Sequence, residues 1–225
     1  MIFFAHRGAR GYEPENTLRA FSRAVDLGAK WIELDVYPIE GELVVFHDLR
    51  LERTTNGKGF IWEQSLDYIR TLDAGKGEKV PLLGEVIHLL DPSICINIEL
   101  KWQGTAELVA DLLTAGDTEK RTDSSRFVIS SFIHSELLKF KQIMPDHRIG
   151  ALTGELPTAY AQFAEQLGAY SVHPTIEFIN QEFVDDAHRR GLQVYVYTIN
   201  HPDELAWMRD LGVDGVFTDY PDKIK

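Results

Sequence analysis

Eight short apolar segments, separated by stretches with helical periodicity, predict an α/β fold of the TIM (βα)8 barrel class. The regular alternation indicates parallel strands, and the count of eight favours a closed barrel over an open doubly wound sheet. Glycines stand just after several predicted helices, where a left-handed residue commonly ends a helix; they are Gly168, Gly191 and Gly212. A length of 225 residues suits one such barrel, so we expect a single domain over residues 1–225.

The first three elements set the direction of the sheet. Residues 2–5 are an apolar strand, and the next apolar strand covers residues 31–36. A helix lies between them, with Asn16 or Thr17 as the expected N-cap and Gly28 after its last turn. A strand, a helix and a second strand in this order begin a parallel sheet.

A less regular stretch follows the second strand. Residues 43–48 form a further short apolar segment, after which residues 49–79 are irregular and rich in glycine and charge. Such excursions inside a compact domain are usually functional. We therefore expect residues 48–79 to form a small insertion over the barrel mouth, before helical periodicity resumes over residues 81–90. The aromatic residues of the insertion either anchor this cover or pack on the outside of the barrel; they are Phe60, Trp62 and Tyr68.

The remaining chain alternates regularly. The predicted strands cover residues 94–100, 127–131, 148–152, 169–172, 193–197 and 214–218, and the predicted helices cover residues 105–115, 135–144, 158–167, 180–190 and 203–211. Residues 116–126 are expected to be a polar loop. Because no segment of helical length follows the eighth strand, we expect the last helix of the barrel to be absent or vestigial.

Composition limits the partners that this chain can have. The formal net charge is −12, with 35 acidic against 23 basic residues. We therefore expect no nucleic-acid partner and no stable membrane association, and an anionic substrate would need a metal ion or a few placed cationic side chains. Cys95 is the only cysteine, which excludes a disulfide framework and a thiolate metal site. Without a signal segment or a long apolar run, the expected location is cytoplasmic.

Two carboxylates lie two positions apart in the second strand. Glu33 and Asp35 project from one face, because side chains alternate along a strand. Two like charges about 4 Å apart repel by roughly 4 kcal/mol at an effective dielectric constant near 20. Such a pair in an apolar strand therefore needs a cation or a proton. The alternative is a strand end at which the acids are solvated or paired with Lys or Arg.

Further charged residues stand at the carboxyl ends of other strands, which is the end where TIM barrels carry their active sites. Together they bring three carboxylates, two histidines and two cations toward one mouth: His6, Arg7, Glu33, Asp35, His47, Glu99 and Lys101. A carboxylate set without cysteine favours one hard divalent cation, Mg²⁺ or Ca²⁺, over Zn²⁺. Each residue also has a structural alternative. His6 and His47 can be structural histidines, Lys101 can simply neutralise Glu99, and His173 ends either a strand or a turn.

An ordered set of motifs spans the chain from residue 2 to about residue 220. They are His6-Arg7-Gly8, Pro14-Glu15-Asn16-Thr17, Glu33-Leu34-Asp35, His47-Asp48, Leu51-Glu52-Arg53-Thr54, Leu72-Asp73-Ala74-Gly75, Asn97-Ile98-Glu99-Leu100-Lys101 and Tyr197-Thr198-Ile199-Asn200. Each motif alone is weak, but the set resembles the glycerophosphodiester phosphodiesterase family. It is most similar to the compact cytoplasmic bacterial members.

The resemblance implies a function and a role for each site residue. Its implied reaction is the metal-dependent hydrolysis of a small-molecule glycerophosphodiester, such as glycerophosphocholine or glycerophosphoethanolamine, to glycerol 3-phosphate and an alcohol, in glycerol and lipid metabolism. The implied roles are metal ligation by Glu33, Asp35 and Glu99, acid/base catalysis by His6 and His47, and phosphate binding by Arg7 and Lys101. Residues 48–79 correspond to the insertion that the family carries over the mouth.

Other functions remain open at this stage. One is a phospholipase D-like lipid phosphodiesterase on the same barrel, although those relatives are typically secreted and disulfide-bonded. Another is a carboxylate-metal isomerase or aldolase, which would not need histidines on both sides of Arg7. A third is a non-catalytic, metal-dependent binding protein, which would normally have lost some of the site residues. The preferred alcohol, the nucleophile, the division of roles between the two histidines and a homodimeric assembly are also left open.

Overall fold

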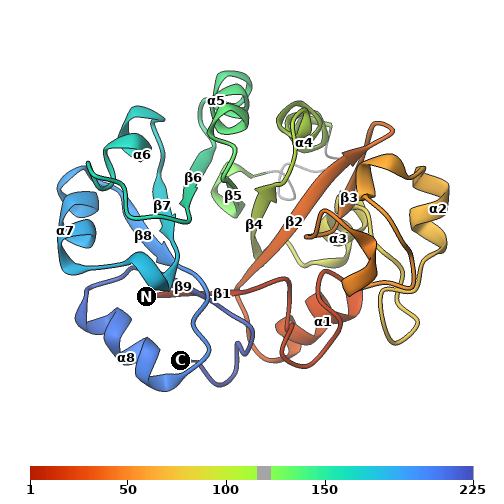
Figure 1. Ribbon diagram of the computed structural model, residues 1–225, viewed down its shortest axis with the longest axis horizontal. Helices are drawn as coiled ribbons and strands as arrows, with labels where there is room; N and C mark the ends of the chain where they lie inside the picture. Colours follow the sequence, from red (N-terminus) through yellow and green to blue (C-terminus); the bar gives the residue numbers. More distant parts are fainter. Residues whose placement is uncertain (116–122, 225) are drawn as a thin grey trace.

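Eight parallel strands form a closed barrel in the computed structural model, which describes residues 1–115 and 123–224 (Figure 1). Within these residues the strands follow the order β1-β9-β8-β7-β6-β5-β4-β2, and the pairing of β2 with β1 closes the ring. Their bounds are β1 Ile2–Ala5, β2 Trp31–Ile39, β4 Cys95–Leu100, β5 Phe127–Ser131, β6 Arg148–Thr153, β7 Ser171–Pro174, β8 Gln193–Val196 and β9 Gly215–Thr218. The predicted TIM barrel is therefore confirmed.

Helices cover the outside of the barrel (Figure 1). The crossover helices are α1 Leu18–Asp26, α3 Leu83–Leu89, α4 Thr105–Thr114, α5 His134–Ile143, α6 Gln162–Gln166, α7 Gln181–Arg189 and α8 Pro202–Asp210, and short 3₁₀ turns occur at η3 Ser124–Arg126 and η4 Ile176–Phe178. After β9 the described residues form only turns, so the last helix is absent there, as predicted. Among the described residues, none of the helices combines the length and the apolar character that crossing a bilayer requires.

Two local predictions need correction. The helix predicted over residues 158–167 begins only at Gln162, because residues 157–160 form a turn in which the N–H of Tyr160 donates to the carbonyl of Pro157. Tyr160 also has a left-handed φ of 45°, which an α-helix cannot continue through. Of the two candidate N-caps of α1, Thr17 is the cap, and the side chain of Asn16 points elsewhere. Residues 116–122 of the predicted polar loop lie outside the described residues.

The interior of the barrel is apolar at its base. Phe4, Tyr195 and Phe217 pack against one another there, with ring centroids 4.5 Å apart for Phe4 and Phe217 and 5.0 Å apart for Phe4 and Tyr195. A larger apolar cluster lies between the strands and the surrounding helices. Because aromatic rings close the base, a ligand can reach the polar residues further along the strands only from the carboxyl end.

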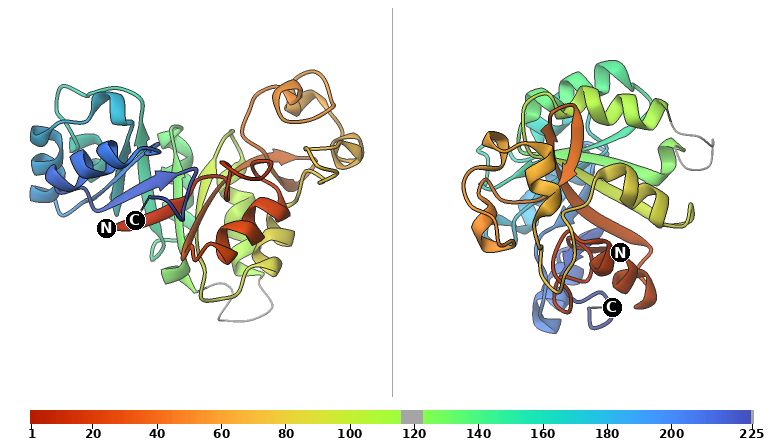
Figure 2. Two further views of the ribbon diagram at one scale, coloured as in Figure 1. Left: turned by 90° about the horizontal axis from the view of Figure 1, so that it is seen from below. Right: turned by 90° about the vertical axis from the view of Figure 1, so that its right-hand side faces the viewer.

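Residues 51–82 form a packed lobe instead of an irregular loop. Strand β3, Glu42–Val45, pairs antiparallel with the outer half of β2 and precedes the lobe. The lobe itself contains η1 Leu51–Arg53, η2 Ile61–Glu63 and α2 Leu66–Thr71. Figure 2 shows the lobe standing beside this outer half of β2. It has an apolar core of its own, made of Tyr37, Ile39, Val44, Phe46, Leu51, Ile61, Ile69, Leu72, Ala74 and Val80.

A stack of rings joins the lobe to the rim of the barrel. Trp62 lies between Phe60 and Trp102, with centroid distances of 4.6 and 4.7 Å and nearly parallel planes. Arg50 covers the ring of Phe60 at 4.6 Å, and the ring of Tyr37 lies 6.3 Å from that of Trp102. Aromatic pairs of this kind contribute about 0.5–1.5 kcal/mol each beyond their buried area. Phe60 and Trp62 therefore act as anchors of the insertion, whereas Tyr68 is exposed and takes no part in the stack.

Candidate active site

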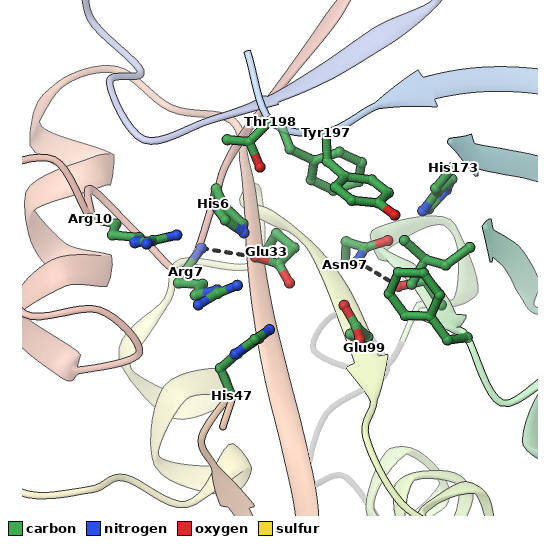
Figure 3. A pocket seen from close by; sticks show the side chains of 14 residues that line it. His6, Arg7, Arg10, Glu33, His47, Asn97, Glu99, His173, Tyr197 and Thr198 are labelled. Atoms are coloured by element: carbon green, nitrogen blue, oxygen red, sulfur yellow. Dashed lines mark hydrogen bonds between the residues drawn. The ribbon is translucent and has the colours of Figure 1, made fainter. Parts of the chain in front are cut away.

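A cavity of about 170 Å³ opens at the carboxyl ends of the strands. Five of the predicted site residues line it: His6, Arg7, Glu33, His47 and Glu99. Figure 3 shows them around one space. The other two predicted residues, Asp35 and Lys101, contact this set directly. All seven are thus brought together, as the strand-end positions predicted.

The three carboxylates meet because β2 and β4 are neighbours in the barrel. Their register places Glu33 opposite Asn97 and Asp35 opposite Glu99. Glu33, Asp35 and Glu99 are buried, and each offers one oxygen within 4.8 Å of the others. This spacing is compatible with three oxygen ligands of a single ion.

Burial and mutual repulsion perturb the three carboxyl groups. Burial, followed by the charge of Asp35, raises the pKa of Glu33 well above its ordinary value. Burial also raises the pKa of Glu99, against the opposing effect of Lys101. At Asp35 burial acts in the same direction, but Lys101 and Arg7 outweigh it and hold the pKa below its usual value. The neighbouring cations therefore compensate the charge of Asp35 but not that of Glu33 and Glu99, whose ionised forms need a further cation.

Two cations lie among these acids. Lys101 Nζ lies 2.7 Å from Glu99 and 3.5 Å from Asp35 Oδ1, an oxygen that has no hydrogen-bond donor among the described residues. The backbone N–H of Arg7 donates to Glu33 at 2.8 Å. The Arg7 guanidinium donates to Glu15 at 2.7 Å, while its buried Nε, 3.4 Å from Asp35 Oδ2, makes no hydrogen bond to any residue that the structure describes. The site thus retains an unused acceptor and an unused donor side by side.

His6 is held from the opposite end of the chain. Its Nδ1 lies 2.7 Å from Oδ1 of Asp219, the residue after β9. Asn200 fixes that carboxylate from two sides, since its Nδ2 donates to Asp219 at 2.9 Å and its Oδ1 accepts the Asp219 backbone N–H at 2.9 Å. Burial lowers the pKa of His6 below its ordinary value, although the contact with Asp219 acts in the other direction.

His47 is held through a chain of ion pairs. Its Nδ1 lies 2.6 Å from Asp48, and Arg53 of the lobe pairs with Asp48 on one side and with Glu15 on the other. Glu15 in turn pairs with Arg7, so the chain returns to the centre of the site. Burial lowers the pKa of His47, and the charge of nearby Asp35 only partly offsets this effect.

The two histidines therefore share one arrangement. Each presents Nδ1 to a carboxylate, which fixes the ring and leaves Nε2 for the cavity. In Figure 3, His6 and His47 lie on either side of Arg7. Such a pair can move protons at two points of one bound group. The sequence indicated both histidines but not the residues that orient them.

The deeper wall of the cavity is also polar. Asn97 on β4 and His173 on β7 both line it, and both are buried. His173 is a strand residue, so the turn that its sequence context allowed does not occur. Its Nε2 lies 2.8 Å from the hydroxyl of Ser171, and burial lowers its pKa to about 3. His173 is therefore neutral at physiological pH.

Comparisons with known proteins agree with this arrangement. Residues 6–223 match the family model described as the glycerophosphoryl diester phosphodiesterase family. A glycerophosphodiester phosphodiesterase of Caldanaerobacter subterraneus subsp. tengcongensis is 36% identical over 99% of this chain and 96% of its own. Another from Bacillus altitudinis is 35% identical over 98% and 95% of the two chains. The structure of an Oleispira antarctica phosphodiesterase in complex with the product sn-glycerol-3-phosphate superposes with a TM-score of 0.88, at 31% identity over 100% of this chain and 95% of that one.

Proposed function

The chain belongs to the glycerophosphoryl diester phosphodiesterase family, and we propose that it hydrolyses small-molecule glycerophosphodiesters to glycerol 3-phosphate and an alcohol. Glycerophosphocholine and glycerophosphoethanolamine are the substrates to test first. The observation that carries the proposal is the pair of carboxylate-held histidines beside one buried cluster of acids and cations. The product bound to the Oleispira antarctica relative supports the same reaction.

One divalent cation, Mg²⁺ or Ca²⁺, would be held by Glu33, Asp35 and Glu99. The chemistry of the ligands fits, since all three are buried oxygens. Within the described residues, Oδ1 of Asp35 has no hydrogen-bond donor, and the cluster has too little positive charge of its own. When bound, such an ion neutralises the charge that develops on phosphoryl oxygens.

Arg7 and Lys101 would bind the phosphate. The buried Nε of Arg7, which makes no hydrogen bond among the described residues, is a donor available to an anionic oxygen. Within the described residues, the ion pairs of Lys101 are with Glu99 and Asp35. The attraction of these two carboxylates outweighs the opposing effect of burial and raises the pKa of Lys101, so the side chain stays charged. Fixed donors of this kind, aimed at developing negative charge, are usually the largest single contribution to catalysis.

His6 and His47 would act as the acid/base pair. With Nδ1 engaged, the Nε2 atom of one ring takes a proton from the nucleophile, and that of the other gives a proton to the leaving alkoxide. Each transfer contributes about 10²- to 10⁴-fold to the rate. The nucleophile is a water molecule or a hydroxyl of the glycerol, which would give a cyclic intermediate.

A coupled assay of glycerol 3-phosphate release tests the proposal. Purified protein should release it from glycerophosphocholine, should lose activity in EDTA and should regain it with Mg²⁺ or Ca²⁺. His6→Ala and His47→Ala should each lower kcat far more than they raise KM, and the double variant should be little worse than either single variant. Release from lysophosphatidylcholine in preference to glycerophosphocholine would favour the phospholipase D-like alternative. No release from any diester would favour a binding protein.

Three further expectations stay predictions. The lobe is proposed to shape the pocket for the glycerol and alcohol ends of the substrate, and its Arg53, which pairs with both Asp48 and Glu15, supports that role. The cytoplasmic location and a homodimeric assembly are carried forward from the sequence alone.

A further inference from the structure

Two buried polar atoms of the cavity wall lack a hydrogen-bond partner in the part of the chain that the structure describes. Oδ1 of Asn97 and Nδ1 of His173 make no hydrogen bond among the described residues, although both side chains are at least 99% buried and both line the cavity. A buried polar atom left unpaired costs about 1–3 kcal/mol. Neither atom takes part in the reaction proposed above. Figure 3 shows Asn97 and His173 beyond Glu33 and Glu99, away from His47.

The surrounding residues hold both atoms in place. Nδ2 of Asn97 donates to the hydroxyl of Ser130 at 2.8 Å, so the oxygen of the same amide is turned away from Ser130. The ring of His173 lies against Gly150 of β6, where an added Cβ would come within 2.4 Å of two ring atoms. Only glycine therefore leaves room for the ring, and this space is what allows Nε2 to reach Ser171. The arrangement is built, because three neighbouring residues are needed to produce it.

The two atoms together suit a hydroxyl group. Ser171 lies at hydrogen-bond distance from Nε2, and in the tautomer in which its hydroxyl donates to Nε2 the neutral ring of His173 carries its proton on Nδ1, as a donor for a ligand. The amide oxygen of Asn97 can only accept. A hydroxyl group can accept the proton of His173 Nδ1 and donate its own to Oδ1 of Asn97. A phosphate oxygen, in contrast, would be repelled by that amide oxygen.

The depth of the pair matches the length of a glycerol arm. Asn97 stands two residues before Glu99 on the same face of β4, which is roughly 6–7 Å further into the barrel. A three-carbon arm on a phosphate held near Glu99 spans about one such step. We propose that Asn97 Oδ1 and His173 Nδ1 bind a hydroxyl of the glycerol end of the substrate and so select glycerophosphodiesters over diesters without that hydroxyl. This inference rests on the proposed function.

Two amide variants of one residue separate this role from a structural one. The amide nitrogen of an asparagine falls near the position of Nδ1 of histidine, and that of a glutamine falls near Nε2. His173→Asn should therefore keep kcat/KM for glycerophosphocholine within a few-fold of the unchanged protein. His173→Gln should lower it about 10- to 100-fold. Cleavage of propylphosphocholine, which has no hydroxyl on its three-carbon arm, should be equal in all three proteins.

A larger loss of kcat/KM for glycerophosphocholine in His173→Asn than in His173→Gln would mean that only the contact with Ser171 matters. This result would overturn the inference. Equal losses on glycerophosphocholine and propylphosphocholine would overturn it too.

Product binding gives a readout without catalysis. By calorimetry, the unchanged protein should bind sn-glycerol 3-phosphate at least about 10-fold more tightly than propyl phosphate, and His173→Gln should bind the two about equally. This comparison on the unchanged protein decides the matter even where a variant fails to fold. A difference of less than about twofold between the two affinities would mean that the two atoms bind a water molecule instead. With hydrolysis still present, this result would overturn the inference and leave the proposed function standing. Absence of hydrolysis with the binding preference intact would instead count against the proposed function.

Discussion

Asp219 accepts a hydrogen bond from Nδ1 of His6 at 2.7 Å, although 213 positions separate the two residues in the chain. The contact exists because β9 pairs with β1 when the barrel closes, with Ala5 opposite Thr218. A carboxylate on Nδ1 fixes the tautomer in which Nε2 is free to accept a proton, and it stabilises the imidazolium that then forms. Asp219 is thus a positioning residue for His6.

Replacing Asp219 tests this role. Asp219→Asn should lower kcat by about 10²- to 10⁴-fold with KM within a few-fold, because an amide can donate to Nδ1 and favour the wrong tautomer. Asp48→Asn should lower kcat by a smaller factor, because the charge of Asp48 is already paired with Arg53. Asp222→Asn, at the same end of the chain but bound to Tyr12, is the matched control. A raised KM with kcat unchanged would mean that Asp219 contacts substrate directly.

Removing one acid from the cluster tests the metal site. Glu99→Gln should abolish calorimetric binding of Mg²⁺ or Ca²⁺ while leaving the thermal transition in place. The fold should tolerate the neutral side chain, since burial already raises the pKa of Glu99. Glu107→Gln, on the exposed side of α4, should bind the ion like the unchanged protein. Undiminished affinity in Glu99→Gln would show that the ion binds elsewhere.

His173 makes stability depend on pH in a calculable direction. Its pKa is about 3 in the folded protein, lowered by burial from an ordinary 6.5. Above pH 6.5 the ring is neutral in both the folded and the unfolded state, so it does not make the free energy of unfolding depend on pH. Below pH 6.5 the unfolded chain binds a proton that the folded protein does not, so stability falls until about pH 3. The loss at pH 5 is about 2 kcal/mol.

Urea denaturation at pH 7 and pH 5 measures this loss. The unchanged protein should lose about 2 kcal/mol more than His173→Asn between the two values, because the variant has no titrating ring. The comparison with the variant removes the contributions of the other titrating groups. An equal loss of unfolding free energy in the two proteins would mean that residues other than His173 cause the pH dependence.

The stack of rings should decide how firmly the lobe is held. Trp62→Ala removes two ring contacts and should cost about 1–3 kcal/mol. Trypsin should then cut faster after Lys58, in the loop that precedes the stack. Trp207→Ala is the control, since Trp207 on α8 is 43% exposed against 36% for Trp62. Similar changes in unfolding free energy and in cleavage after Lys58 in both variants would mean that the stack does not hold the lobe against the barrel.

The barrel was predictable from the sequence because its signals are local. Apolar strands, periodic helices and C′ glycines repeat along the chain; the three glycines do have left-handed φ values of 64°, 77° and 79°, at Gly168, Gly191 and Gly212. The alternation of side chains along β2 and β4 was enough to bring Glu33 and Glu99 to one mouth, because the register of parallel strands does the rest.

The residues that orient the site were not predictable in the same way. The pairing of His6 with Asp219 depends on barrel closure, and the pairing of Arg53 with Glu15 depends on how the lobe folds back. The side chain of Asn16 is suited to capping a helix, yet it donates to Asp35 at 2.9 Å, and only the fold brings that partner within reach. The lobe itself has short 3₁₀ turns whose apolar residues follow no regular period, so its core left no pattern to detect.

Strand β2 belongs to two structural units at once. Residues 31–36 of it pair with β4 inside the barrel, and residues 36–39 pair with β3 beneath the lobe. Any graft that exchanges the lobe between relatives must therefore be cut within β2. A transplant of residues 36–82 carries the hairpin and the whole apolar core with it, whereas one of residues 48–79 would leave half of that core behind on the recipient.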